Sequence, residues 1–329
     1  MITTTDFIQT QDIMQHLVAV PYDVTRHSLY CAADLYQGYN PDRPETFQTC
    51  YDTRVYQHFL TEGKQMTGVA ESLARTLHDN GVHTALNEFL LQHDPLRCVG
   101  IMGGHALLRT DPMYREIMLI SKRLTELGFL MLSGGGPGAM EATHLGAWLA
   151  GRNQEEADAA LQMLLPHPSF HDEGWLASAF HVMKRYPQQR LSSDNYKFES
   201  LGIPTWLYGH EPSTPFATHI AKFFENSIRE DSILTLAYGG LIYAPGSAGT
   251  MQEIFQEAVQ NHYLSFGFSS PMIFLGSHFW TEEMPAYHLL QYLSKTGMYK
   301  NLLLTLSDNS EEIISTLLEF QEKMKDTND

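Results

Sequence analysis

From residue 97 onward, short apolar runs alternate with longer segments in which apolar residues recur every three or four positions. The short runs lead into glycine, as in RCVGIMGG (97–104), FLMLSGGG (129–136) and GLIYAPG (240–246). A short apolar run bounded by glycine is typical of a strand buried on both faces, and the longer period is typical of a helix. The alternation therefore predicts an α/β fold: a Rossmann-like, doubly wound parallel sheet with helices on both faces, which binds ligands at the carboxyl ends of its strands.

The same pattern predicts further elements along this part of the chain. Additional strands are expected over IPTWLYG (203–209), PMIFLG (271–276) and NLLLTLSD (301–308). Helices are expected over 113–128, from near Pro137, over 217–230, from Thr250, and over 311–320. On the helix that starts at Thr250, the expected buried stripe is Ile254, Phe255, Ala258 and Val259.

Two regions depart from this alternation. Residues 1–95 are expected to form a mostly helical N-terminal extension, in which the segment 66–92 predicts two short amphipathic helices that break at Asn80-Gly81. Residues 96–329 would then form the Rossmann-like domain. Within it, residues 151–200 are too long for a simple connection, and we expect an insertion with a helix over 155–165 that covers the ligand site.

Composition and charge limit the classes of partner. The net charge of −17, with 43% hydrophobic and 18% charged residues, fits a globular protein and disfavours a nucleic-acid surface, which needs clustered Lys and Arg. Three widely spaced cysteines (Cys31, Cys50 and Cys98) favour a reducing compartment. The chain shows no signal-peptide pattern and no apolar run of membrane-spanning length, so we expect a cytoplasmic protein with no membrane partner.

The first glycine-rich loop follows the strand FLMLS and contains Gly134, Gly135, Gly136 and Gly138. Glycines between a strand and a helix allow backbone N–H groups to approach a ligand, and a helix N-terminus favours an anion. A tight strand-to-helix turn with structural glycines is an equally good interpretation. The loop is not a GxGxxG fingerprint, so a nicotinamide dinucleotide is not favoured.

The second loop, PGSAGT at 245–250, also joins a predicted strand to an amphipathic helix. It is neither a phosphate-binding GK[ST] loop nor a GxSxG nucleophile elbow, because Pro245 stands where that motif needs glycine. Two glycine-rich loops at the ends of parallel strands would meet at one edge of the sheet. Together they favour a nucleotide or another phosphorylated sugar as ligand.

Two charged residues near the second loop are open to two interpretations. Glu253 ends the pattern Thr250-x-x-Glu253, which fits a helix capping box, and spacing alone favours that structural role. Arg229 could pair with Glu225 one helical turn earlier. Alternatively, both side chains act on a ligand held by the loop.

Other chemistries fit less well. His167 and His171 have helical metal-ligand spacing, but prolines flank His167 and no HExxH glutamate is present, so no metal site is expected. His105 is interpreted as a polar turn residue. Neither glycine loop contains the lysine that a pyridoxal-phosphate enzyme requires, and no cofactor is expected.

GGGPGAMEA (134–142) and PGSAGTMQE (245–253) together resemble the motifs of the LOG family, whose members were long labelled lysine decarboxylases. The resemblance extends from about Arg97 to the C-terminus. Characterised members hydrolyse nucleoside 5′-monophosphates to a free base and ribose 5-phosphate. The extension at 1–95 and the insertion at 151–200 indicate a larger branch of the family, with Ser247 in place of the usual second glycine.

The resemblance implies a role for each motif residue. Glu253 and Arg229 would be catalytic. The 5′-phosphate would be bound by the second loop: Gly246, Ser247, Ala248, Gly249 and Thr250. The nucleotide would be bound by Gly134, Gly135, Gly136, Gly138, Met140 and Gly104.

The resemblance also implies a reaction and a quaternary structure. Departure of a base from ribose leaves positive charge on the sugar, which a carboxylate can stabilise while it activates water. The expected protein is a hydrolase of N-glycosidic bonds in nucleoside 5′-monophosphates that forms a homodimer or a higher homo-oligomer. The alternative is a non-catalytic nucleotide-binding or sensor protein on the same fold.

Overall fold

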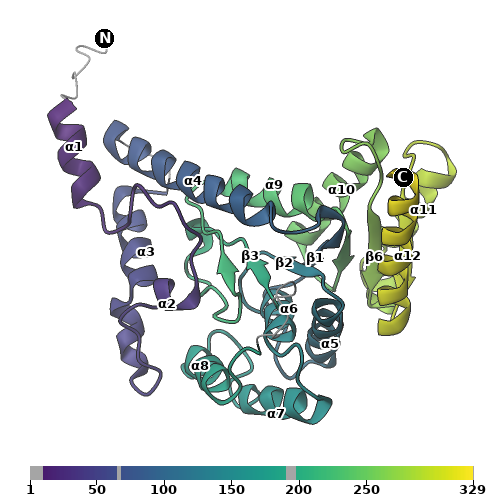
Figure 1. Cartoon of the computed structure of the whole chain (residues 1–329), viewed down its shortest axis with the longest axis horizontal. Helices are drawn as coiled ribbons and strands as arrows, with labels where there is room; N and C mark the ends of the chain where they lie inside the picture. Colours follow the sequence, from purple (N-terminus) through teal and green to yellow (C-terminus); the bar gives the residue numbers. More distant parts are fainter. Residues whose placement is uncertain (1–9, 65–67, 190–197, 329) are drawn as a thin grey trace.

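The computed structural model describes residues 10–64, 68–189 and 198–328. In these ranges seven strands form one parallel sheet, in the order β4-β3-β2-β1-β5-β6-β7 (Figure 1). The chain winds outward from β1 to one edge, returns to the centre at β5, and winds outward to the other edge, which confirms the predicted doubly wound fold. The strands are β1 (Cys98–Met102), β2 (Leu130–Ser133), β3 (Ser200–Gly202), β4 (His219–Ile220), β5 (Gly240–Tyr243), β6 (Pro271–Leu275) and β7 (Leu303–Ser307).

The part of the chain before β1 is helical, as expected, and contains α1 (Thr10–Ala19), α2 (Ala32–Leu35), α3 (Tyr51–Glu62) and α4 (Val69–Leu90). The remaining helices connect or follow the strands: α5 (Pro112–Glu126), α6 (Ala139–Trp148), α7 (Gln154–Leu164), α8 (Trp175–Arg185), α9 (Asn226–Leu236), α10 (Ala248–Tyr263), α11 (Ala286–Lys295) and α12 (Ser310–Asn328). Short 3-10 segments are η1 (Pro44–Thr49), η2 (Pro95–Arg97) and η3 (Trp206–Tyr208), and a π-helical turn, η4, spans Phe279–Glu283.

Hydrophobic clusters cover both faces of the sheet. Along β1, Val99 and Ile101 belong to the cluster that includes α5, α6 and α12, whereas Cys98 and Met102 belong to the cluster on the opposite face with α4, α9 and α10. In Figure 1, α5 and α6 lie on one side of the strands and α4, α9 and α10 lie on the other. Burial on both faces explains why these strands read as continuous apolar runs rather than as alternating ones.

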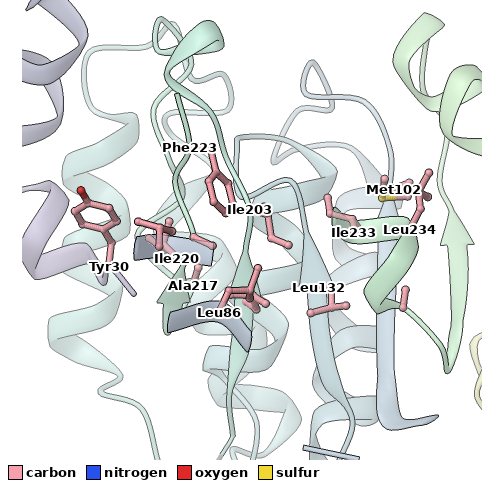
Figure 2. Close-up of a cluster of buried hydrophobic side chains, with 14 of the residues drawn as sticks. Tyr30, Leu86, Met102, Leu132, Ile203, Ala217, Ile220, Phe223, Ile233 and Leu234 are labelled. Carbon is pink, nitrogen blue, oxygen red and sulfur yellow. The ribbon is translucent and has the colours of Figure 1, made fainter. Parts of the chain in front are cut away.

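The N-terminal helices share their hydrophobic cluster with the sheet. Tyr30 forms an antiparallel bridge to β4, in which its N–H donates to Ile220 O at 2.8 Å and its carbonyl accepts from Ile220 N at 2.7 Å. Figure 2 shows Tyr30 beside Ile220, and Leu86 of α4 close to Ala217. The described N-terminal residues therefore pack on one face of the sheet and along its β4 edge, and the domain boundary at residue 95 stays a prediction.

The predicted break at Asn80-Gly81 is wrong, because α4 is one helix over Val69–Leu90. A β-carbon on Gly81 would clash with the carbonyl oxygen of Arg26. The glycine at this position permits close approach of another backbone segment, and the packing gained there outweighs its low helix propensity.

Two elements before α9 also differ from prediction. Strand β3 ends at Gly202, and the expected strand 203–209 contains η3, where the Thr205 hydroxyl accepts a hydrogen bond from Leu207 N at 3.1 Å. The expected helix 217–230 begins instead with the edge strand β4. Helix α9 starts at Asn226, because the Glu225 carboxylate accepts from Ser227 N at 3.3 Å and caps it.

The insertion contains the predicted helix at Gln154–Leu164, which confirms the expectation to within one residue, and a second helix, α8. Arg109, in the loop after β1, donates to Ser178 Oγ of α8 at 2.9 Å and to Glu141 Oε2 of α6 at 2.9 Å. The insertion is thereby tied to the helix that follows the first glycine loop. Part of the segment 151–200, residues 190–197, lies outside the described residues.

Candidate functional site

A cavity of about 380 Å³ lies at the carboxyl ends of β1, β2 and β5. It is bounded by the loops after these strands, by the first turn of α10, and by Arg229 and Glu230 of α9. Between the neighbouring strands β1 and β5 the direction of winding reverses. Doubly wound sheets bind ligands at this switch point, because the loops diverge there and leave a crevice.

The structure brings most of the residues predicted from sequence into this cavity. The predicted residues that line it are Gly104, Gly134, Met140, Arg229, Ser247, Ala248, Gly249, Thr250 and Glu253. Gly135, Gly136, Gly138 and Gly246 belong to the same loops but not to the described lining. None of the described residues 151–189 and 198–200 lines it, although the ring of Phe170 contacts that of His105, which does, so the expectation that the insertion covers the site stays a prediction.

The glycine loops contact one another through their backbones. Gly104 N donates to Pro245 O at 3.0 Å, and Ala139 N donates to Gly104 O at 3.2 Å. Gly138 has a φ of 68°, and a β-carbon there would meet His105 O at 2.7 Å. This glycine is explained by packing against the β1 loop, and its role in nucleotide binding stays a prediction.

The start of α10 presents unpaired backbone donors to the cavity. Ser247 is the N-cap residue and makes no side-chain capping bond. Within the described residues, the N–H groups of 247–250 donate to no other group. A β-carbon on Gly249 would have nothing within 4 Å, so this turn faces open space. Free amides at the N-terminus of a helix suit an anion.

The capping-box interpretation of Glu253 is wrong. Thr250 lies inside α10, whose N-cap is Ser247, so it cannot form the cap with Glu253. In the described part of the chain, no group donates a hydrogen bond to the Glu253 carboxylate, which lines the cavity. Burial raises the pKa of Glu253 to about 7; the charge of Arg229 opposes this shift and the nearby Glu230 adds to it.

The predicted pairing of Arg229 with Glu225 is also wrong, because the Glu225 side chain caps α9 and the described residues show no ion pair between these two side chains. The guanidinium lies against the first glycine loop: a β-carbon on Gly134 would come within 2.6 Å of Arg229 Nη2. Arg229 Nε is buried without a hydrogen-bond partner in the described residues. Such a group can still bind a ligand or an ordered water.

The sequence analysis missed several residues of the cavity wall. His105, interpreted as a turn residue, lines the cavity, as do Tyr208 and Glu211 beyond β3 and Gln252 and Gln256 on α10. The predicted strand 203–209 put Tyr208 within the sheet, whereas β3 ends at Gly202 and Tyr208 lies in η3 beyond it. Glu211 carried no motif, so only its position after β3 could have revealed it.

The buried stripe of α10 differs in part from prediction. Ile254 and Ala258 are buried, but Val259 is 41% exposed. Glu257 is buried instead, and its carboxylate accepts a hydrogen bond from Ser270 Oγ at 2.5 Å. Burial raises the pKa of Glu257 to about 7, and the bond from Ser270 partly opposes the shift.

In the three described ranges, no group of three or more His, Cys, Asp or Glu side chains is arranged to hold a metal ion. Likewise, no helix within those ranges is both long and apolar enough to span a membrane.

Comparison with known proteins identifies no family. No family model matches the chain, and no curated protein matches it. Among solved structures, the molybdenum cofactor binding protein from the phototrophic bacterium Rippkaea orientalis is similar, with 14% identity and a TM-score of 0.42 over 68% of this chain and 96% of that one. At this level of similarity the match carries no argument about function.

Proposed function

We propose that this protein hydrolyses the N-glycosidic bond of a nucleoside 5′-monophosphate, releasing the free base and ribose 5-phosphate. The observation that carries the proposal is the placement of Glu253 one helical turn after the unpaired amides of α10, with Arg229 of the neighbouring helix α9 in the wall of the same cavity. The motif resemblance to the LOG family supports the same reaction. The amides of α10, Glu253 and Arg229 each have a distinct part in the proposed hydrolysis.

The amides at the start of α10 would bind the 5′-phosphate. They offer several N–H donors to one anion, and the helix dipole adds favourable charge. The Thr250 side chain lies close to Gly246, within the same turn. Because the chain carries a net charge of −17, binding of an anion must depend on such local donors rather than on the field of the whole protein.

Glu253 would act on the sugar. As the bond between C1′ and the base breaks, its electron pair leaves with the base and the ribose ring gains positive charge. The ionised carboxylate stabilises that charge, accepts a proton from the attacking water, and so allows the hydroxyl to bond to C1′. A pKa of about 7 suits a group that accepts and returns a proton near neutral pH.

Arg229 would support the leaving group. Its guanidinium lies beside Gly134 of the first glycine loop, in the wall of the same cavity. A fixed cation there stabilises the negative charge that develops on the departing base, and it also favours the ionised form of Glu253. Both side chains lie on helices, which hold them in fixed positions relative to the phosphate.

The test is release of base by the purified protein from a panel of nucleoside 5′-monophosphates and the matching nucleosides, followed by chromatography. We expect free base from monophosphates and at least about 100-fold less from nucleosides, because the phosphate anchors the sugar. Equal release from both would contradict the phosphate-anchored mechanism. Tight binding without any release would instead identify a nucleotide-binding or sensor protein.

We further propose that the protein acts in the cytoplasm as a homodimer. The cysteines Cys31, Cys50 and Cys98 are all unbonded, which suits a reducing compartment. On α10, Val259 and Tyr263 lie one turn apart and are 41% and 73% exposed, an apolar surface that a second copy could cover. Light scattering of the purified protein would test the dimer, and Tyr263→Glu should weaken it.

A further inference from the structure

The cavity has a second end, beyond β3, that the groups considered so far do not use. Tyr208 of η3 and Glu211 line the cavity there. They are held together locally, because Glu211 N donates to Tyr208 O at 2.8 Å. The chemistry at this end bears on which base the site accepts.

The order of the strands places this end away from the phosphate. The strands β5, β1, β2 and β3 are consecutive neighbours in the sheet, so the loops after β5 and β3 are about 14 Å apart at the usual strand spacing. The amides of α10 follow β5, Arg229 lies against Gly134 after β2, and Glu211 follows β3. A monophosphate held at α10 would therefore direct its base toward Glu211.

Within the described ranges, the Glu211 carboxylate is a hydrogen-bond acceptor without a donor. No described residue donates to its carboxylate, and the nearest basic atoms, His105 Nδ1 and His210 Nε2, are each 3.8 Å from Oε1. The side chain is 17% exposed. By contrast Glu230, another carboxylate of the cavity wall, accepts a hydrogen bond from Asn226 Nδ2 at 2.7 Å.

The surroundings of Glu211 suit a flat base. A β-carbon on Gly136 would come within 3.7 Å of Glu211 Oε2 and within 2.8 Å of Met140 Cε, so the carboxylate lies close to the first glycine loop and to a thioether side chain. Tyr208, 41% exposed, adds an aromatic ring to the same wall. Aromatic and thioether groups offer a base apolar contact with its faces and leave its edge for hydrogen bonding.

We propose that Glu211 selects monophosphates whose base carries an exocyclic amino group, such as adenine, against those with a carbonyl oxygen at that position. A carboxylate can only accept a hydrogen bond, so it matches an amino group, whereas a carbonyl oxygen would repel it and leave it unpaired. Discrimination against an analogue that lacks the donor is effective when the partner group is poorly solvated. This inference rests on the function proposed above and adds its substrate class.

The experiment compares AMP with IMP, which differ in this one group. We expect kcat/KM for base release to be roughly 10- to 100-fold higher for AMP. In Glu211→Gln the amide can donate to a carbonyl as well as accept from an amine, so the AMP-to-IMP ratio should fall to within about threefold of unity. The matched control is Glu230→Gln, which removes the same charge from the same cavity and should leave the ratio high.

Binding separates a failure of this inference from a failure of the proposed function. In Glu253→Gln, calorimetry should give a lower Kd for AMP than for IMP, and the added change Glu211→Gln should remove the difference. Equal kcat/KM for AMP and IMP in the unaltered protein would overturn the role of Glu211 and leave the hydrolase standing. Neither release nor binding of any monophosphate would overturn both.

Discussion

Two glutamates on α10, Glu253 and Glu257, lie one turn apart and differ in their surroundings. Burial raises the pKa of each to about 7. Glu257 faces the protein interior, is 3% exposed, and accepts a hydrogen bond from Ser270. Glu253 lines the cavity together with Arg229, whose charge acts on it, and accepts no hydrogen bond from the described residues.

The difference teaches that a shifted pKa alone does not identify a functional residue. Desolvation disfavours the charged form of any buried carboxyl, whatever that group does. Of the two, only Glu253 combines the shift with access to a cavity, a cation in the same wall and an adjacent set of free amides. Perturbed pKa values indicate function when this geometry accompanies them.

The largest expected effect separates the two glutamates directly. Glu253→Gln removes the carboxylate that stabilises the sugar cation, so kcat for base release should fall at least about 1000-fold. Glu257→Gln makes the same chemical change one turn later, away from the cavity, and should stay within about threefold of the unaltered enzyme. Chromatography of released base measures both.

Nucleotide binding provides the control for this pair. Because Gln has the size of Glu, Glu253→Gln should still bind AMP by calorimetry and keep its circular dichroism spectrum. If both glutamine variants lost activity equally, the contrast between the two sites would be wrong.

A smaller loss of activity is expected from substitution of Arg229, whose charge acts on Glu253. Arg229→Gln removes the cation beside Gly134, and we expect a loss of roughly 100-fold in kcat. Because the charge of Arg229 lowers the pKa of Glu253, its removal should also move the acidic limb of the pH–rate profile upward. In the unaltered enzyme this limb should lie near pH 7, with activity falling as Glu253 becomes protonated.

The pH–rate profile of base release, measured from pH 5 to 9 in both proteins, tests this prediction. An unchanged midpoint in Arg229→Gln would contradict the electrostatic contact between these side chains.

Stability should respond to Glu257 more clearly than activity does. Its pKa is raised from 4.5 when unfolded to about 7 when folded, so the folded state binds its proton more tightly. The resulting stability is full below about pH 4.5 and is lost as the pH rises through about 7. At pH 8, Glu257→Gln should therefore unfold with a free energy about 3 kcal/mol higher than the unaltered protein, and at pH 5 the difference should be below about 1 kcal/mol.

Urea unfolding at both pH values measures this difference. A gap of the same size at pH 5 and pH 8 would contradict the assignment of the titration to Glu257.

The smallest effect is expected from substitutions in the second glycine loop, which lies next to Glu253 but not next to Glu257. A β-carbon on Gly246 would clash with the Thr250 side chain, whereas one on Gly249 would meet nothing within 4 Å. Both alanine variants should raise KM for a monophosphate by about tenfold, because both alter the proposed anion site. Only Gly246→Ala should lower Tm by several degrees; equal Tm values would contradict the packing described here.

The sequence predicted the strands where an apolar run ends in glycine, and it predicted both loops of the site. It failed where contacts from distant segments decide the conformation. Gly81 continues α4 because the backbone of Arg26 packs against it, and His219 and Ile220 form a strand because Tyr30 pairs with it. Such contacts leave no local pattern, so periodicity could not reveal them.

What the amino-acid sequence determined by itself was the alternation of buried strands and amphipathic helices, and with it the edge of the sheet where ligands bind, because parallel strands align their carboxyl ends. Only the tertiary structure decided what each side chain does there. It excluded the cap for Glu253 and the ion pair for Arg229, and it brought Glu211 to the far end of the cavity. The physical reason is that hydrogen bonding and desolvation depend on neighbours in space, which spacing along the chain does not specify.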